Sequence, residues 1–209
     1  MKDANNRKPG VPLPRKGKNL TIKKNINLAS AEEASRVYNK VKDRLADINN
    51  WDQWSGKGSG IFTLTDPEGT KKNNLPAIGD YIKIKIPAPK SANSDGFDWV
   101  KIDKIDSKNV KDTDERYIIQ VHPSQNPLNK NNEVSHFLDS DATSTFIVSR
   151  KGKQVAAEIY GRNELPNVEK AQGVFNKLRN IVVGLFATAG LARIQWEKLA
   201  AGLLEFDNN

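Results

Sequence analysis

The sequence predicts an α+β protein whose curved antiparallel sheet of about seven strands surrounds a long C-terminal helix. In the middle of the chain, segments of alternating apolar and polar residues are separated by turn residues rather than by helices, which predicts an antiparallel meander. A long helical pattern follows at the C-terminal end. Its middle is apolar on nearly every side, so both sides need to be covered.

The N-terminal part of this fold is predicted as one strand and two short helices. Apolar residues alternate over residues 19–28, as in a strand with one buried face. Ser30 as N-cap and Glu33 three residues later predict the start of an amphipathic helix over about residues 31–47. A short helical turn at residues 51–54 carries two tryptophans, which we expect to act as packing anchors.

Six further strands and a final helix complete the predicted order. The strands are expected at residues 61–65, 80–87, 97–105, 116–122, 143–150 and 154–162, the last two forming a hairpin. After a breaker at residues 165–167, a helix is expected over about residues 169–205, apolar all round between Ile181 and Ala192. A curved sheet, a partner chain or a bound apolar ligand could each cover that stretch.

The positive charge of the chain is concentrated at its N-terminus. Of the net charge of +8, residues 1–24 contribute eight basic side chains and one acid, so about +1 is left for all other residues. Residues 1–18 are also rich in proline and glycine, and we expect a flexible basic arm there, followed by one folded domain over residues 19–209. A solvated tail is the favoured interpretation of the arm, and an electrostatic tether for nucleic acid, acidic lipid or an acidic protein is the other. Nucleic acid is an unlikely partner for the folded body.

Several classes of protein are excluded or disfavoured by what the sequence lacks. It has no cysteine, so disulfides, zinc–thiolate sites and thiol nucleophiles are excluded. No apolar run precedes Leu20, and no run reaches the roughly 20 residues of a membrane-spanning helix, so we expect a cytoplasmic protein without a membrane span. Without a P-loop or a dinucleotide fingerprint, no cofactor is expected. The sequence does not determine the oligomeric state.

Two short segments resemble a known superfamily. Residues 20–22 followed by 31–38 look like the opening strand and first helix of the START-like proteins, also called helix-grip proteins. Residues 47–54 are similar to the segment of that superfamily that leads from an aspartate to paired tryptophans. Polyketide cyclase and dehydratase-like proteins and the birch-pollen-allergen relatives belong to this superfamily. The resemblance spans about residues 19–206. Two polar connections, at residues 90–96 and 123–142, are longer than the superfamily pattern, and each could form a lid over a pocket or only decorate the surface.

The resemblance implies an apolar cavity between the concave face of the sheet and the final helix, which superfamily members use for lipids, sterols, polyketides and hormones. The alternation of the strands and the helical spacing predict which side chains face it: Ile82, Ile84, Val100, Ile102, Ile119, Phe146, Val148, Ala157 and Ile159 from the sheet, and Leu185, Phe186 and Ala189 from the helix. The alternative is that the same side chains interdigitate and leave a sealed core.

The polar residues give no recognisable catalytic or metal motif. The two histidines are His122 and His136, and neither lies in such a motif. The second histidine has only a loose acidic cluster nearby, formed by Glu133, Asp139 and Asp141, for which we expect a solvated loop without metal.

One face of the last strand carries Glu158, Tyr160 and Arg162. An ion-paired solvent face is the favoured interpretation of these three residues, and orientation of a ligand in the cavity the other.

Three functions follow from the sequence. The leading hypothesis is non-covalent binding of a small hydrophobic molecule, without catalytic residues. The second is an interaction protein with a filled core, whose basic arm docks an acidic partner or nucleic acid. The third is a cyclase-like enzyme that uses Glu158, Tyr160 or Arg162 as polar groups in the cavity.

Overall fold

The computed structural model describes residues 8–56, 59–85, 97–111, 114–128, 138, 140–165 and 193–206. The elements are β1 (Lys18–Asn27), α1 (Ala31–Ala46), a single 3-10 turn η1 (Ile48–Asn50), α2 (Trp51–Ser55), β2 (Ile61–Thr65), β3 (Tyr81–Lys85), β4 (Asp98–Lys111), β5 (Asp114–Pro123), β6 (Thr143–Lys151) and β7 (Gln154–Glu164). A C-terminal helix is described over residues 193–204. The predicted order of elements is confirmed over these residues, and the strands and helices from β1 to β7 begin and end within a few residues of the predicted limits, except that β4 continues to Lys111. The predicted start of the final helix, near residue 169, lies outside the described residues.

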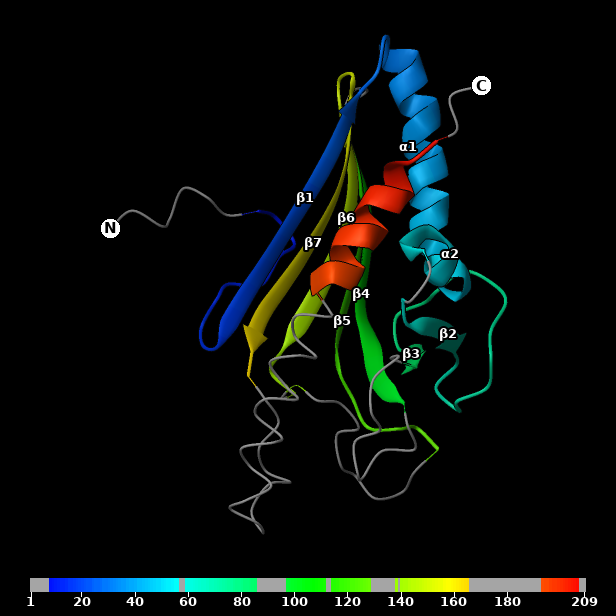
Figure 1. Cartoon of the computed structure of the whole chain (residues 1–209), viewed down its shortest axis with the longest axis vertical. Coiled ribbons are helices and arrows are strands. Elements are labelled where there is room, and N and C mark those ends of the chain that lie inside the picture. The colour runs from blue at the N-terminus through cyan, green and yellow to red at the C-terminus, as the bar shows by residue number, and fades with distance from the viewer. Residues whose placement is uncertain are drawn as a thin grey trace.

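The seven strands form one antiparallel sheet in the order β1-β7-β6-β5-β4-β3-β2 (Figure 1). From β2 to β7, each strand pairs with the next one along the chain, which confirms the predicted meander. The first strand, β1, forms the other edge of the sheet, with Ile22 opposite Ile159 of β7. The α+β class predicted from the alternation is therefore correct.

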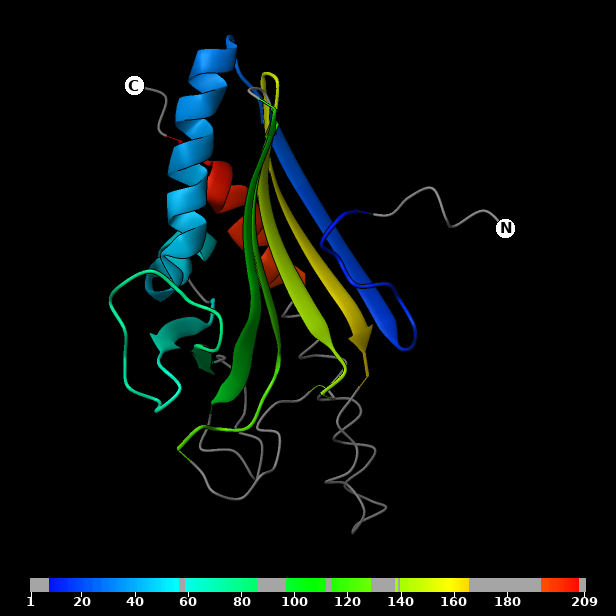
Figure 2. The same ribbon diagram turned by 180° about the vertical axis from the view of Figure 1, so that it is seen from behind.

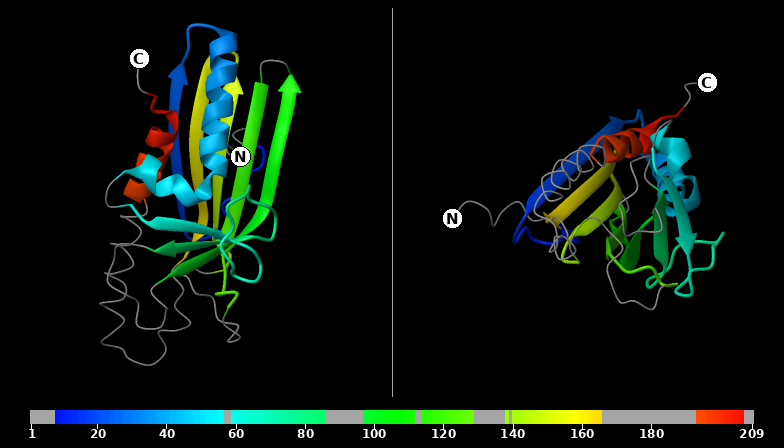
Figure 3. Two further views of the ribbon diagram at one scale, coloured as in Figure 1. Left: turned by 90° about the vertical axis from the view of Figure 1, so that its right-hand side faces the viewer. Right: turned by 60° about the horizontal axis from the view of Figure 1, so that its bottom comes forward.

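The sheet is curved, and its curvature is concentrated around β4. The β4–β5 register shifts between Ile102 and Lys104, so Asp103 is an extra residue on β4. Such bulges bend a strand and increase its twist. Beyond this strand, β2 and β3 run across the direction of the long strands (Figure 3). The bend gives the sheet a concave face.

Helix α1 packs on the concave face against β6 and β7. Its N-terminus is capped as predicted, because Ser30 Oγ accepts a hydrogen bond from Glu33 N at 3.1 Å. The carboxylate of Glu33 in turn accepts one from Ala29 N at 3.0 Å. The buried side of the helix, which includes Tyr38 and Val41, belongs to the main core cluster.

The C-terminal helix lies on the same face, with Leu199 and Leu203 in the same core cluster (Figures 1 and 3). Arg44 Nη1 of α1 donates hydrogen bonds to three carbonyls at the end of this helix, those of Gly202, Leu203 and Glu205, at 3.2, 3.1 and 2.6 Å. The two helices are thus joined at their ends. Within the described residues, no helix is long and apolar enough to cross a membrane.

Some predictions fall on segments that lie outside the described residues. These include residues 1–7 of the arm, the polar connection 90–96, residues 129–137 and 139 of the connection 123–142, and the apolar stretch from Ile181 to Ala192. The predictions made for those segments stay predictions.

Residues 8–17, which the sequence analysis assigns to the arm, lie against the convex face of the sheet (Figure 2, dark blue). Val11 packs on a small cluster of side chains from three strands, formed by Ile118, Ile147 and Tyr160. The backbone N–H groups of Arg15 and Lys16 donate hydrogen bonds to Asn163 Oδ1 at 2.8 and 3.4 Å. This part of the N-terminus therefore covers sheet surface in the structure.

Candidate ligand-binding site

The concave face of the sheet brings together the residues predicted to line a cavity. One core cluster contains Ile82, Ile84, Val100, Ile102, Ile119, Phe146, Val148, Ala157 and Ile159, and all of them are buried. Leu185, Phe186 and Ala189, predicted to face them from the helix, lie outside the described residues. The shared face and the burial of the nine sheet residues are thus established, and their contact with a ligand stays a prediction.

Four aromatic side chains connect the C-terminal helix to both parts of the bent sheet, the short strand β2 and the long strand β6. Trp196 of this helix lies 5.9 Å from Phe62 of β2 and 5.1 Å from Phe146 of β6, measured between ring centroids. Trp51 lies 5.3 Å from Phe62, 4.8 Å from Phe146 and 6.4 Å from Trp196. Offset and edge-to-face pairs of this kind add to the stabilisation that burial gives. Trp51 is a packing anchor, as predicted, with its indole N–H donating to the Leu45 carbonyl at 3.0 Å.

A carboxyl interrupts the apolar surface at one end of the concave face. Asp98 opens β4 and stands directly opposite Ile84 of β3, and residues opposite each other in an antiparallel pair share a face. The Asp98 side chain is half-buried, and burial raises the pKa of this carboxyl to about 7. Within the described part of the chain, its carboxyl makes no hydrogen bond or ion pair.

The opposite end of the concave face also carries ionisable groups, but these are paired. Arg150 Nε donates to Glu115 Oε2 at 2.6 Å across the β5–β6 register, and both side chains are largely buried. Burial raises the pKa of Tyr38 to about 12 and also raises the pKa of Tyr117. Since these tyrosines stay neutral and the ion pair is made within the protein, this end is structural.

Comparisons with known proteins found similar solved structures. No protein-family model and no curated protein matches its sequence. Among solved structures, the Zhui aromatase/cyclase from a Streptomyces species is 7% identical, over 87% of this chain and 94% of that one, with a TM-score of 0.41. The truncated norcoclaurine synthase from Thalictrum flavum is 9% identical, over 85% and 98%, with a TM-score of 0.40. A Thermus thermophilus protein is 11% identical, over 90% and 94%, with a TM-score of 0.43.

The helix-grip fold is confirmed. One strand, two helices, six meandering strands and a C-terminal helix on the concave face are the features that the sequence predicts. At such low identities, the similarity to the solved structures says nothing about a ligand or a reaction of this helix-grip chain.

Three polar residues of β7 do not reach the concave face, contrary to one of the two interpretations of the sequence. Tyr160 and Glu158 lie on the convex face, where Tyr160 Oη donates to Glu158 Oε2 at 2.9 Å. The guanidinium of Arg162 lies 5.0 Å from the Tyr160 ring centroid and donates to the Leu20 carbonyl at 2.6 Å. A cyclase-like use of these groups on the concave face is therefore wrong.

The favoured interpretation of the same residues, an ion-paired solvent face, needs a correction. Glu158 is ion-paired, but with the N-terminal segment: Lys8 Nζ lies 2.7 Å from Glu158 Oε2. However, Glu158 and Tyr160 are only 8% and 3% exposed, because the N-terminal segment covers them. The alternation of apolar and polar residues in β7 does not reveal this cover, because the covering N-terminal segment is distant in the sequence.

The groups considered for metal binding or catalysis are separated or engaged. His122 Nδ1 lies 2.6 Å from Asp103 Oδ2 at the outer surface. Asp141 pairs with Lys16 at 2.7 Å, and this partner lowers the pKa of the Asp141 carboxyl. His136, Glu133 and Asp139 lie outside the described residues.

Sequence reasoning missed two residues of the candidate site. Asp98 reads as one more polar residue at the start of a strand, and only its pairing with Ile84 gives it a place among apolar side chains. Trp196 fits the apolar spacing of the final helix, but its partners in the aromatic cluster come from three distant segments.

Proposed function

We propose that the protein binds a small, mainly apolar molecule between the concave sheet face and the C-terminal helix, with a hydrogen-bond donor of that molecule at Asp98. The observation that supports this proposal is the half-buried Asp98 carboxyl, which has no partner in the described part of the chain and lies beside the apolar core cluster. Burying a carboxyl without a partner costs free energy. A ligand that supplies the partner recovers that cost, so the site favours ligands with such a group.

The chemistry of Asp98 indicates the class of ligand. With a pKa of about 7, the group is partly ionised near neutral pH. The ionised form accepts hydrogen bonds and attracts a cation. An apolar body with one amine or hydroxyl group therefore fits this site better than an apolar body alone or one that carries a carboxylate.

Dye displacement tests this proposal. An environment-sensitive apolar dye is bound to the full chain and displaced by matched pairs of ligands, a long-chain alkylamine and the alkane of the same length. We expect the amine to bind about tenfold more tightly, since a hydrogen bond to a charged group contributes about 1.5 kcal/mol or more. In Asp98→Leu the dye should still bind, and the preference for the amine should disappear.

Asp103→Asn is the matched control, because Asp103 lies on the same strand but contacts His122 at the outer surface. This variant should keep the preference for the amine. Failure of the dye and of both ligands to bind would refute a cavity, whereas equal affinities for amine and alkane would refute only the role of Asp98. Native mass spectrometry of protein purified from its own host would identify a guest that co-purifies.

The second hypothesis, a basic arm that docks an acidic partner, loses support from the contacts of the N-terminal segment. Lys8 is paired with Glu158, and Lys16 is paired with Asp141. Two of the basic groups counted for the arm therefore already have carboxylate partners within the chain.

A further inference from the structure

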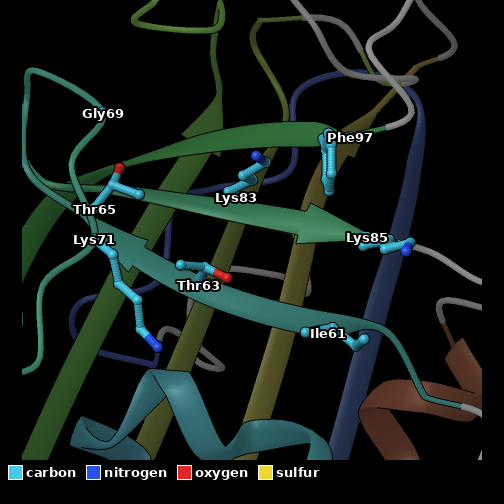
Figure 4. A pocket seen from close by; sticks show the side chains of 8 residues that line it. All are labelled: Ile61, Thr63, Thr65, Gly69, Lys71, Lys83, Lys85 and Phe97. Atoms are coloured by element: carbon cyan, nitrogen blue, oxygen red, sulfur yellow. The ribbon is translucent and has the colours of Figure 1, made fainter.

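The outer face of β2 and β3, on the other side of the sheet from Asp98, is hollowed. A depression of about 220 Å³ is lined by Ile61, Thr63, Thr65, Gly69, Lys71, Lys83, Lys85 and Phe97 (Figure 4). These strands turn Phe62, Leu64, Ile82 and Ile84 into the core, so the residues between them face outward. The depression is thus separate from the concave face.

Three lysines surround this depression without a carboxylate partner in the described part of the chain. Lys71, Lys83 and Lys85 flank Thr63 from different sides (Figure 4). Two carboxylates of the adjoining loop are engaged, because Asp80 pairs with Lys72 and Asp66 accepts from Thr70 N at 2.7 Å. Like charges gathered on one surface repel one another, and an anion between them relieves that repulsion.

Protection of a sheet edge explains two of these three lysines poorly, Lys83 and Lys85. Lys71, in contrast, forms a β-bridge with Thr65 of the edge strand. Lysine on an edge strand discourages pairing with another sheet. Here the edge strand is β2, whose five residues, Ile61–Thr65, are all uncharged. Two of the lysines lie instead on β3, which is paired on both sides.

The depression also offers neutral groups that suit an organic anion. Thr63, half-buried in its middle, has a hydroxyl that can donate to an anion oxygen. Phe97 and Ile61 supply apolar surface at one end, and Lys83 Nζ already lies 3.8 Å from the Phe97 ring centroid. Cationic, hydroxyl and aromatic groups therefore meet within a volume that suits a small molecule.

We propose that this depression binds a small organic phosphate, with the phosphate between Lys71, Lys83 and Lys85 beside Thr63, and the organic part on Ile61 and Phe97. The ammonium groups contribute charge-assisted hydrogen bonds, and the flexible lysine stems allow them to converge on the phosphate. This site is independent of the proposed function of the concave face.

An NMR titration of the ¹⁵N-labelled full chain with phenyl phosphate and with inorganic phosphate tests the proposal. At physiological salt, we expect saturable shifts confined to β2, β3 and residues 69–71, with tighter binding of phenyl phosphate. The double variant Lys83→Gln/Lys85→Gln should weaken binding about tenfold or more, because two charged donors are lost. The matched control Lys151→Gln/Lys153→Gln removes the same charge from the distant β6–β7 hairpin and should bind as the unmodified chain does.

Each contrary outcome is distinct. Shifts that do not saturate, or equal weakening in both double variants, would overturn the site and leave only general charge attraction. Equal affinity for the two phosphates would overturn the role given to Ile61 and Phe97. Co-sedimentation with vesicles containing phosphatidic acid, lost in Lys83→Gln/Lys85→Gln, would overturn the assignment to a soluble phosphate in favour of a lipid headgroup. The ¹⁵N spectra of the variants themselves show whether each is folded.

Discussion

Ionisable side chains occur at both ends of the concave face, and they differ in whether the protein satisfies them. Glu115 and Arg150 pair with each other at 2.6 Å, so their burial is compensated within the fold. Asp98 has no such partner among the described residues, and its pKa is raised to about 7 by burial alone. The pair between Glu115 and Arg150 is explained by its contribution to stability. The Asp98 carboxyl lowers stability, and binding of a ligand there would explain its presence.

The raised pKa of Asp98 predicts how stability changes with pH. An aspartate in an unfolded chain has a pKa of about 3.9, so between pH 4 and 7 the folded state binds more protons at this site than the unfolded state. The contribution of Asp98 to stability is therefore present below pH 4 and is lost as the pH rises through 7. Asp98→Asn should be more stable than the unmodified protein at pH 8 by about 1 kcal/mol, a value reduced for solvent screening, with little difference at pH 4. Urea denaturation at the two pH values measures this, and the same difference at both would contradict it.

The elements on the concave face are joined by a few close contacts at the end of the C-terminal helix. Arg44 of α1 donates to its last carbonyls and lies with its guanidinium 4.2 Å from the Trp54 ring centroid. At Gly202, the helix approaches α2 so closely that an added Cβ would meet the carbonyl oxygen of Trp54. The absence of a side chain at Gly202 therefore sets the distance between these two elements.

This contact predicts the effect of Gly202→Ala. Alanine favours a helix over glycine by about 1 kcal/mol, but here the Cβ would push the helix away from backbone that cannot yield. We expect a net loss of about 2 kcal/mol in the free energy of unfolding. Thermal or urea denaturation measures it. Ala201→Ser, at the exposed neighbouring position, is the control and should cost less than about 1 kcal/mol. A stabilised Gly202→Ala variant would show that α2 moves freely.

At the scale of the molecule, helices cover the concave face of the sheet and the N-terminal segment covers part of the convex face, and the sequence predicts only the first of these covers. Alternation identifies every strand and the side that each turns to the core, because it is a local property of the sequence. The convex cover depends on Val11, one of two apolar residues among prolines and lysines, whose contacts lie more than 100 residues away. The same limit applies to Asp98, whose environment is set by pairing between strands rather than by its neighbours in sequence.

Removal of the convex cover predicts a loss of stability for the whole domain. A chain that begins at Lys18 lacks the packing of Val11 and the pair between Lys8 and Glu158, and it leaves Tyr160 exposed. We expect the free energy of unfolding to fall by about 2 kcal/mol, from the loss of one packed apolar side chain and of a partly buried ion pair. Deletion of residues 1–7 alone keeps these contacts and is the control. If both truncations leave the urea midpoint unchanged, the segment contributes nothing to stability.

The meeting of Trp51 and Trp196 gives the protein an optical reporter of its own. These are two of its four tryptophans, and they sit edge to face at the point where the C-terminal helix touches both halves of the sheet. Their fluorescence emission depends on the polarity and the packing density of their surroundings. A ligand that displaces the C-terminal helix would therefore shift the wavelength of the intrinsic tryptophan emission, and no added label is needed to detect it.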